Sequence, residues 1–339
     1  MNHAYEFNRE NWKLALTKAQ LSQFHLKTLC DMLYRPEKTN TLSFKLQTFM
    51  QKFNHSLPEI IQTETSSDNT TKFILKLSDG LKVETVLIPF YKKMTICLST
   101  QVGCAMNCSF CYTGTQGFSR NLTCDEIVGQ YLVVKNWLKE KEPTADNPNI
   151  VFMGQGEPLH NVNEVLASLK IFLDKDMLGL GRRQITLSTV GYLPGLKQLE
   201  LFPPINFALS LHSPRHTERT KLIPVNTHFP LEKVLEELGK VTFQKNKILT
   251  IEYLLIENFN DSVAHAEELA LLLKDKKVMI NLISFNPFPG CSYKRPSDVS
   301  VENFKHMLVK HKLRVTIRRS KGQDILAACG QLNSKPAVH

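Results

Sequence analysis

Hydrophobic positions near the start of the chain recur at helical spacing and then change to alternation. Between residues 9 and 53, leucine, phenylalanine and methionine recur every three or four positions, which predicts helices separated near Pro36. Between residues 58 and 90, hydrophobic and polar residues alternate on both sides of Asp79-Gly80. Asp-Gly between alternating segments is a strong signal for a β-hairpin. We therefore expect helices followed by a hairpin in the first 90 residues.

The register of this hairpin decides the surroundings of Glu84. A two-residue loop would place Leu75 opposite Glu84. That face of the hairpin would also carry Phe73, Leu77 and Val86. A carboxylate on an apolar face has a raised pKa and suits proton abstraction, so Glu84 is a candidate general base. A surface glutamate on an edge strand is the alternative.

From Met94 onward, short hydrophobic segments alternate with longer segments of helical spacing. The short segments predict six strands, at residues 94–99, 149–154, 185–189, 206–211, 249–255 and 278–285. Helices are expected between most of them, at residues 124–140, 161–175, 231–240 and 262–275. A repeated strand–helix order predicts a parallel sheet with helices outside it. Six units favour an α/β fold built as a partial (β/α)6 barrel, and a doubly wound sheet is the alternative.

The pattern of the tail completes the predicted organisation. One further helix is expected at residues 301–310 and one further strand at 313–317. The chain would then divide into an N-terminal accessory domain of helices and hairpin, a barrel core, and a C-terminal extension. The predicted boundaries are residues 1–93, 94–299 and 300–339.

Charge and cysteine content indicate the cellular compartment of the protein and the class of its partner. The 339 residues carry a net charge of +10, which favours nucleic acid over a membrane as partner, although a lysine-rich solvated surface would give the same charge. No segment approaches ~18 uncharged apolar residues, and residues 1–13 lack the apolar stretch of a signal peptide. We therefore expect a cytoplasmic protein whose eight cysteines serve metals and catalysis rather than disulfides.

Polar residues and glycines gather where the predicted strands end. Five such segments occur, at residues 104–111, 154–158, 188–189, 210–212 and 286–290. In a barrel-like sheet these ends meet on one face, where active sites are built. Each segment could serve alone as a turn or a helix cap, but five at equivalent positions favour a shared site.

The strongest chemical signal is the spacing C-x3-C-x2-C of Cys104, Cys108 and Cys111. Short cysteine-rich segments are typical of metal sites. Structural zinc takes four ligands, whereas an iron–sulfur cubane held by three thiolates keeps one iron open, as catalytic metal sites do. The alternative is three thiols buried on one helical face at i, i+4 and i+7. Gly103 and Asn107 favour a loop over that helix.

Cys329 in the tail is a second candidate for chemistry. It follows Arg318, Arg319 and Lys321, and nearby cations lower the pKa of a thiol, so Cys329 is a candidate nucleophile. A C-terminal cysteine without special function is the alternative. The same three cations are candidates for contacts with nucleic-acid phosphates.

Several stretches resemble one family, the RlmN/Cfr radical S-adenosylmethionine (SAM) RNA methyltransferases. The resembling stretches are residues 95–104, 116–122, 153–158, 186–189, 210–212, 281–283, 286–290 and 329–332. The three clustered cysteines alone indicate the radical SAM superfamily. Cys97 and Cys329 narrow the resemblance to this family.

The resemblance implies the cofactors and the residues that hold them. Cys104, Cys108 and Cys111 are expected to bind one [4Fe-4S] cluster. The SAM site is expected to be formed by Gly156, Glu157, Ser188, Ser210, Leu211, His212 and Asn286. Three catalytic roles are also implied: Cys329 becomes an S-methylcysteine, Cys97 forms a transient disulfide with it, and Glu84 occupies the family's proton-acceptor position.

The implied reaction is methylation of an adenosine in 23S rRNA and/or tRNA, supported by an electron donor such as flavodoxin or ferredoxin. Residues 116–118 and 286–290 resemble RlmN more than Cfr, which favours C2 of the base over C8. Either Glu84 or Cys97 would remove the ring proton. Two alternatives remain: a radical SAM enzyme acting on a small molecule, and a non-catalytic iron–sulfur or zinc protein that binds RNA.

Overall fold

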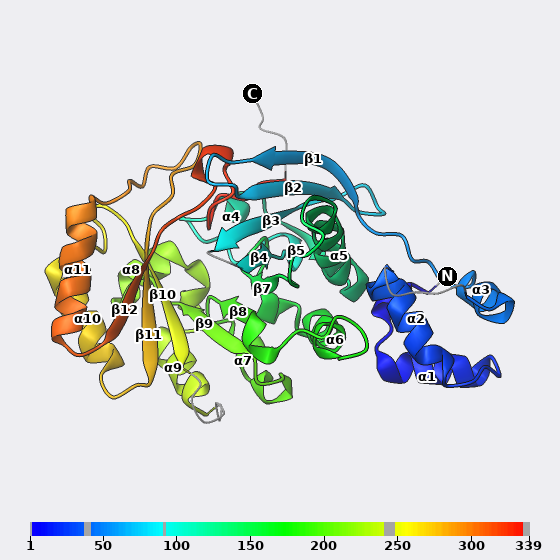
Figure 1. Cartoon of the computed structure of the whole chain (residues 1–339). Coiled ribbons are helices and arrows are strands. Elements are labelled where there is room, and N and C mark those ends of the chain that lie inside the picture. Colours follow the sequence, from blue (N-terminus) through cyan, green and yellow to red (C-terminus); the bar gives the residue numbers. More distant parts are fainter. Residues whose placement is uncertain (1, 37–41, 91–92, 241–247, 335–339) are drawn as a thin grey trace.

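An open ten-stranded sheet forms the centre of the computed structural model, which describes residues 2–36, 42–90, 93–240 and 248–334 (Figure 1). Six consecutive strands of this sheet are parallel neighbours, as predicted: β4 (Lys93–Cys97), β7 (Asn149–Phe152), β8 (Ile185–Thr189), β9 (Asn206–Ser210), β10 (Leu249–Leu255) and β11 (Val278–Ser284). The parallel strand β12 (Arg314–Arg318) follows β11. The α/β class with a partial barrel is confirmed.

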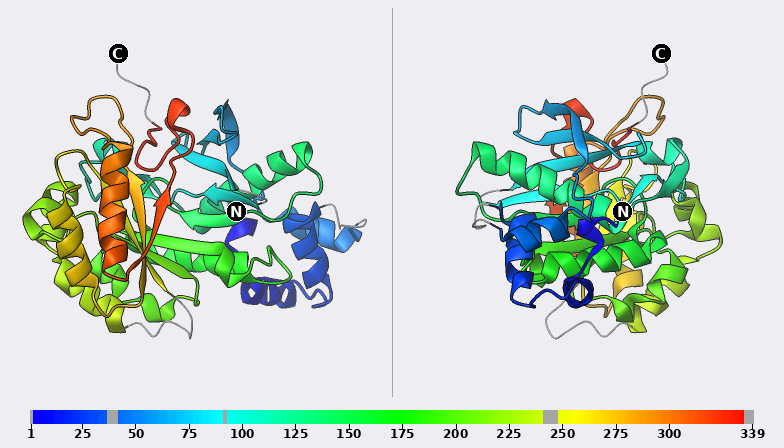
Figure 2. Two further views of the ribbon diagram at one scale, coloured as in Figure 1. Left: turned by 60° about the vertical axis from the view of Figure 1, so that its left-hand side comes forward. Right: turned by 90° about the vertical axis from the view of Figure 1, so that its right-hand side faces the viewer.

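The helices cover the outer side of the curved sheet (Figures 1 and 2). The long ones are α5 (Cys124–Lys141), α6 (Val162–Leu173), α9 (Leu231–Lys240), α10 (Val263–Leu273) and α11 (Asp298–Lys310). Their positions match the predicted helices closely, because each carries an apolar face at helical spacing. Two short helices, α7 (Leu193–Leu196) and α8 (His216–Leu222), were not predicted. None of the helices in the described ranges is long and apolar enough to cross a bilayer.

Three antiparallel strands extend the sheet beyond β4. They are β1 (Glu59–Thr65), which was not predicted, and the hairpin strands β2 (Thr71–Lys76) and β3 (Lys82–Phe90). Strand β3 pairs directly with β4, so the hairpin and the barrel strands share one sheet. The division into domains 1–93, 94–299 and 300–339 remains a prediction.

The predicted register of the hairpin is wrong by one residue. Glu84 lies opposite Ile74, not Leu75. The loop has three residues instead of two, because the amide of Leu77 donates to the carbonyl of Leu81 over 2.8 Å. Gly80 closes this loop with φ +86°, a conformation that suits a residue without Cβ.

A shift of one residue moves a side chain to the other face of a sheet. Glu84 therefore shares its face with Lys72 and Val86 rather than with Phe73 and Leu77. Phe73 packs against Trp137 of α5, on the side of the main core. The opposite face, which carries Glu84, looks toward the C-terminal segment.

Three N-terminal helices dock against the end of the sheet that carries α5 and α6 (Figure 2). They are α1 (Arg9–Lys18), α2 (His25–Tyr34) and α3 (Phe44–Met50), in the region predicted to be helical. Trp12 is their central apolar residue, in ring contact with Phe7, Phe49 and Phe53. The ammonium group of Lys135 on α5 donates to the carbonyl of Tyr34 over 3.1 Å, which ties α2 to the core.

We predict that Trp12→Ala lowers the free energy of unfolding by about 3–5 kcal/mol, because the fully buried indole would leave a cavity. Urea denaturation followed by circular dichroism at 222 nm measures the change. Phe24→Ala is the matched control: this ring is 94% exposed, so the midpoint should stay close to that of the unaltered protein. Equal shifts for the two variants would contradict the core assigned to these helices.

Candidate active site

The three clustered cysteines lie in a loop between β5 (Gln101–Gly103) and α4 (Tyr112–Thr115). Asn107 inside this loop has φ +52°, so the backbone is not helical there and the alternative of three thiols on one helical face is wrong. Cys104, Cys108 and Cys111 all line one cavity of about 140 Å³. The structure therefore has a loop at these cysteines, as Gly103 and Asn107 indicated, and the binding of a cluster by them stays a prediction.

The chemistry of these thiols fits an iron–sulfur cluster. Burial raises the pKa of Cys104 to about 12 and that of Cys108 further, and the neighbouring thiols add to both effects. Three buried thiols cannot ionise together unless a bound cation compensates their charge. In the described chain no three donor side chains converge on a single ion. A cubane does not require such convergence, because each thiolate binds a different iron.

The same cavity brings together most of the predicted SAM residues. Five of the seven line it: Gly156, Glu157, Ser188, Ser210 and His212. Leu211 is fully buried beside the cavity. The amide of Asn286 donates to the carbonyl of Cys329 over 3.3 Å, so Asn286 holds the C-terminal segment in this structure.

Backbone geometry fixes Gly156 and Glu157 at the end of β7. Gly156 has φ +100°, and a Cβ there would come within 2.6 Å of the side chain of Gln101, so only glycine fits. The carboxylate of Glu157 accepts hydrogen bonds from the amides of Leu159 and Val190, each over 3.0 Å. Burial raises the pKa of Glu157 to about 7, and these two amides oppose the shift. The two amides therefore fix the orientation of the Glu157 carboxylate in the cavity that the three clustered cysteines also line.

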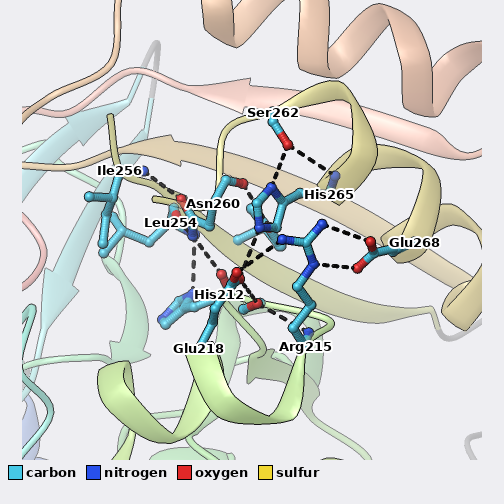
Figure 3. Close-up of polar contacts among 11 residues, drawn as sticks. His212, Arg215, Glu218, Leu254, Ile256, Asn260, Ser262, His265 and Glu268 are labelled. Atoms are coloured by element: carbon cyan, nitrogen blue, oxygen red, sulfur yellow. Dashed lines mark hydrogen bonds and ion pairs between the residues drawn. The ribbon is translucent and has the colours of Figure 1, made fainter. Parts of the chain in front are cut away.

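His212 is held in a strained conformation, with φ +63° (Figure 3). Its Nδ1 accepts a hydrogen bond from the amide of Leu254 over 3.1 Å, so the neutral ring carries its proton on Nε2. Burial lowers the pKa of His212 to about 3, which keeps the ring neutral. The ring of Phe110 packs edge-on against it, with centroids 4.6 Å apart.

Asn260 supports this loop, and the sequence pattern gave no sign of it. Its side-chain amide donates to the carbonyls of His212 and Leu254, both over 2.6 Å. Its oxygen accepts from the amide of Ile256 over 2.7 Å. The fully buried Asn260 thus ties the end of β9 to the end of β10 (Figure 3). Such contacts over 42–48 residues along the chain follow no sequence period.

A second polar network links α8 with α10 just outside this loop (Figure 3). Arg215 forms a two-point ion pair with Glu268, with distances of 2.7 and 2.8 Å. His265 contacts the carboxylate of Glu218 over 2.9 Å and the hydroxyl of Ser262 over 2.6 Å. These contacts position the two helices next to the loop of His212.

A larger cavity of about 1450 Å³ adjoins the first and opens among the inner faces of the strands. Both cavities are lined by Cys329, and the larger one also by Cys97 at the end of β4. Both cysteines are free thiols. The pKa of Cys97 is raised to about 12, mainly by burial and also by the proximity of Cys329, whereas Arg318 lowers it. The two cysteines from distant parts of the chain therefore lie close together.

Glu84 lines neither cavity. The side chain is 2% exposed, and its carboxylate accepts a hydrogen bond from the amide of Asn333 over 2.6 Å. Lys72 lies 3.4 Å from the other carboxylate oxygen and donates to the carbonyl of Ile325 over 2.8 Å. Burial raises the pKa of Glu84, and Lys72 lowers it. The C-terminal segment thus covers the candidate base in this structure.

Five cations line the larger cavity. The tail contributes Arg318, Arg319 and Lys321, as the sequence suggested. Arg182 and Arg183, which precede β8, were missed. Both are exposed, and their sequence signal was a pair of adjacent cations directly before a predicted strand.

A partial parallel barrel whose first βα connection carries three cysteines is the architecture of the radical SAM enzymes, and residues 98–273 match the model of the Radical SAM superfamily. Proteins of similar sequence narrow this class to RNA methyltransferases. The chain is 45% identical to the dual-specificity RNA methyltransferase RlmN of Syntrophus aciditrophicus (strain SB), over 83% of this chain and 80% of that protein. It is 42% identical to the RlmN of Pseudomonas fluorescens (strain SBW25), over 81% of this chain and 73% of that protein.

A solved structure agrees with these relatives. The crystal structure of a radical SAM methyltransferase from Sphaerobacter thermophilus superposes with a TM-score of 0.92 at 31% identity, over 99% of this chain and all of that one. The chain therefore belongs to the RlmN/Cfr family of radical SAM RNA methyltransferases. The recognition made from the sequence is confirmed, and so is SAM-dependent RNA methyltransferase as the class of enzyme.

We predict that Asn260→Asp weakens SAM binding about tenfold or more, because the carboxylate cannot donate to the two carbonyls that Asn260 now holds. Isothermal titration with SAM, performed without air on the iron-loaded protein, measures the change. Ser262→Ala is the control: it removes the cap of α10 and should lower the melting temperature while the SAM dissociation constant stays unchanged. Equal loss of SAM affinity in both variants would show that Asn260 matters only for stability.

Proposed function

We propose that the protein methylates C2 of an adenosine in rRNA and/or tRNA through an S-methylcysteine at Cys329. The observation that carries the proposal is the position of Cys329, which lines both the cavity of the cysteine cluster and the larger cavity. A thiol at this junction can receive a methyl group on one side and present it on the other. The dual-specificity RlmN relatives support RNA as the substrate.

Cys104, Cys108 and Cys111 would hold a [4Fe-4S] cluster with one iron left open, and SAM would lie in the adjoining cavity. When bound, these groups supply one-electron chemistry, which the reaction needs because the electron-poor C2 of adenine cannot attack a methyl group as a nucleophile. Glu157 offers a buried carboxylate in the lining of the same cavity. The residues present therefore fit both cofactors.

Cys329 carries the one-carbon group to the base, and the thiolate of Cys97 then attacks the sulfur of Cys329. A disulfide between the two cysteines forms as the bond from that sulfur to the transferred carbon breaks, and the carbon keeps the electron pair and takes up a proton to become the methyl group of the product. Attack of a thiolate on sulfur requires access and a suitable pKa, and Arg318 lowers the pKa of Cys97 against the larger effect of burial. Glu84 and Cys97 are the two candidate bases for the ring proton. Glu84 requires a shift of the segment around Asn333, because that amide now occupies its carboxylate.

RNA would enter the larger cavity, whose lining includes the cations Arg319 and Lys321. Such cations contact phosphates without reading sequence. The net charge of +10 supports this partner. An electron donor of the flavodoxin or ferredoxin type completes the proposed set of partners, and the eight free cysteines suit a reducing cytoplasm.

The cluster can be tested by iron content. Anaerobically reconstituted protein should be brown and hold about four irons per chain. Cys108→Ala should lose the visible absorption and the iron. Cys291→Ala is the control, since this free cysteine packs near the same loop without lining the small cavity. Zinc in place of iron after anaerobic reconstitution would exclude the proposed cluster.

The roles of the two cysteines can be tested by trapping. Cys97→Ala should leave methylation of Cys329 intact and stall release, which gives a denaturation-resistant protein–RNA species. Mass spectrometry should then find a Cys329 peptide bearing adenosine plus a one-carbon bridge. The double variant Cys97→Ala/Cys329→Ala should give none, and Cys30→Ala, a buried cysteine of α2, should behave like the unaltered enzyme. Free methylated RNA at the normal rate from Cys97→Ala would overturn both assignments.

A further inference from the structure

The junction of the two cavities holds two charged groups that the mechanism above leaves without a full explanation. Five residues line both cavities: Met153, Glu252, Ile283, Arg318 and Cys329. Glu252 belongs to β10 and Arg318 to β12, with β11 between them. A buried carboxylate and a guanidinium therefore face the place where the methyl carrier lies.

Glu252 is oriented by a chain of hydrogen bonds across three strands. The hydroxyl of Thr316 donates to Oδ1 of Asn281, and Nδ2 of Asn281 donates to Oε1 of Glu252 over 3.1 Å. The second oxygen, Oε2, is buried and has no partner in the part of the chain that the structure describes. The side chain is only 5% exposed. A buried carboxylate oxygen without a hydrogen bond lowers the stability of the fold, so we expect Oε2 to accept a hydrogen bond from a bound ligand.

Arg318 presents the complementary chemistry. Among the described residues its one hydrogen-bond partner is the sulfur of Met153, 3.6 Å from Nη1, and a thioether is a weak acceptor. No ion pair within the described ranges joins Arg318 to Glu252. Its titratable neighbours are Cys329, Glu252 and Cys97, which raise the pKa of the guanidinium against the effect of burial. Most of its five N–H donors remain available.

We propose that Glu252 and Arg318 read the Watson–Crick edge of the target adenine, an inference that rests on the function proposed above. That edge presents the N6 amine as donor, N1 as acceptor and then C2. Glu252 Oε2 accepts a hydrogen bond from N6, and Arg318 donates one to N1. Enzymes that modify bases commonly read an extruded base through this edge.

The order of the protein groups matches the order of the base atoms. Arg318 is near Glu252, Cys97 and Cys329, whereas Cys97 is near Arg318 and Cys329 but not within the influence of Glu252. N1 likewise lies between the C6 amine and C2. Pairing the first two atoms with Glu252 and Arg318 therefore brings C2 toward the two cysteines.

This pairing has two chemical consequences. Guanine and hypoxanthine present a donor at N1 and an acceptor at C6, the reverse of adenine, so both would leave a carboxylate and a guanidinium unsatisfied. Donation from Arg318 to N1 also withdraws electron density from the adjacent C2. A carbon that is attacked because it is electron-poor becomes more reactive.

Substitution of single base atoms tests the proposal against matched variants. The target adenosine in an RNA substrate is replaced by purine riboside, which lacks the amine, or by 1-deazaadenosine, which lacks N1. The unaltered enzyme should lose about ten- to hundredfold in kcat/KM with each analogue. Glu252→Leu should abolish the loss for purine riboside only, and Arg318→Met the loss for 1-deazaadenosine only, as a double-mutant cycle requires.

Equilibrium binding of the same RNAs, measured by fluorescence anisotropy, provides a readout that is independent of turnover. Arg319→Met is the control: it lines only the larger cavity and should weaken all three RNAs by the same factor. Equal turnover and equal binding of all three RNAs by the unaltered enzyme would overturn the reading pair, even if both variants failed to fold. Absence of any methylated adenosine from the natural substrate would instead overturn the proposed function.

Discussion

The C-terminal segment is held on the barrel by hydrogen bonds to backbone carbonyls, and the arrangement of the site depends on this docking. The amide of Tyr112, one residue beyond the last clustered cysteine, donates to the carbonyl of Gly330 over 2.6 Å. Gln331 donates to the carbonyl of Pro287 over 2.6 Å, and Thr113 donates to that of Leu332. Hydrogen bonds between rigid loops fix a side chain more closely than apolar packing does, because they are directional. Cys329 therefore sits at a defined place between the two cavities.

Desolvation sets the chemistry around this junction. Glu84, Glu157 and Glu252 are all buried carboxylates with raised pKa values, yet each meets a different partner: a lysine, two backbone amides, or an asparagine with one oxygen left over. Burial favours the neutral form of each, and the partner decides how far that preference goes. The proposed roles of the three glutamates, as a base, an acceptor in the small cavity and a base-reading group, therefore rest on the partners of one residue type.

Much of this architecture could be predicted from the sequence, because it follows local periods. The six parallel strands, the long helices and the convergence of Cys104, Cys108 and Cys111 all derive from spacing or from strand-end positions. The register of Glu84 could not be predicted, since a three-residue turn and a two-residue turn share the signal Asp79-Gly80. The contacts of Asn260 join residues dozens of positions apart. Such contacts arise from packing between elements, which no periodic pattern encodes.

The pairing of β3 with β4 places Val86 directly beside Cys97. The strand that carries Glu84 is therefore hydrogen-bonded to the strand that carries Cys97. A chimaera between two relatives is therefore best joined just before β1. Such a junction would transfer only the three N-terminal helices. Glu84 and Cys97, the two candidate proton acceptors, would then both come from the same parent protein and lie on the same sheet.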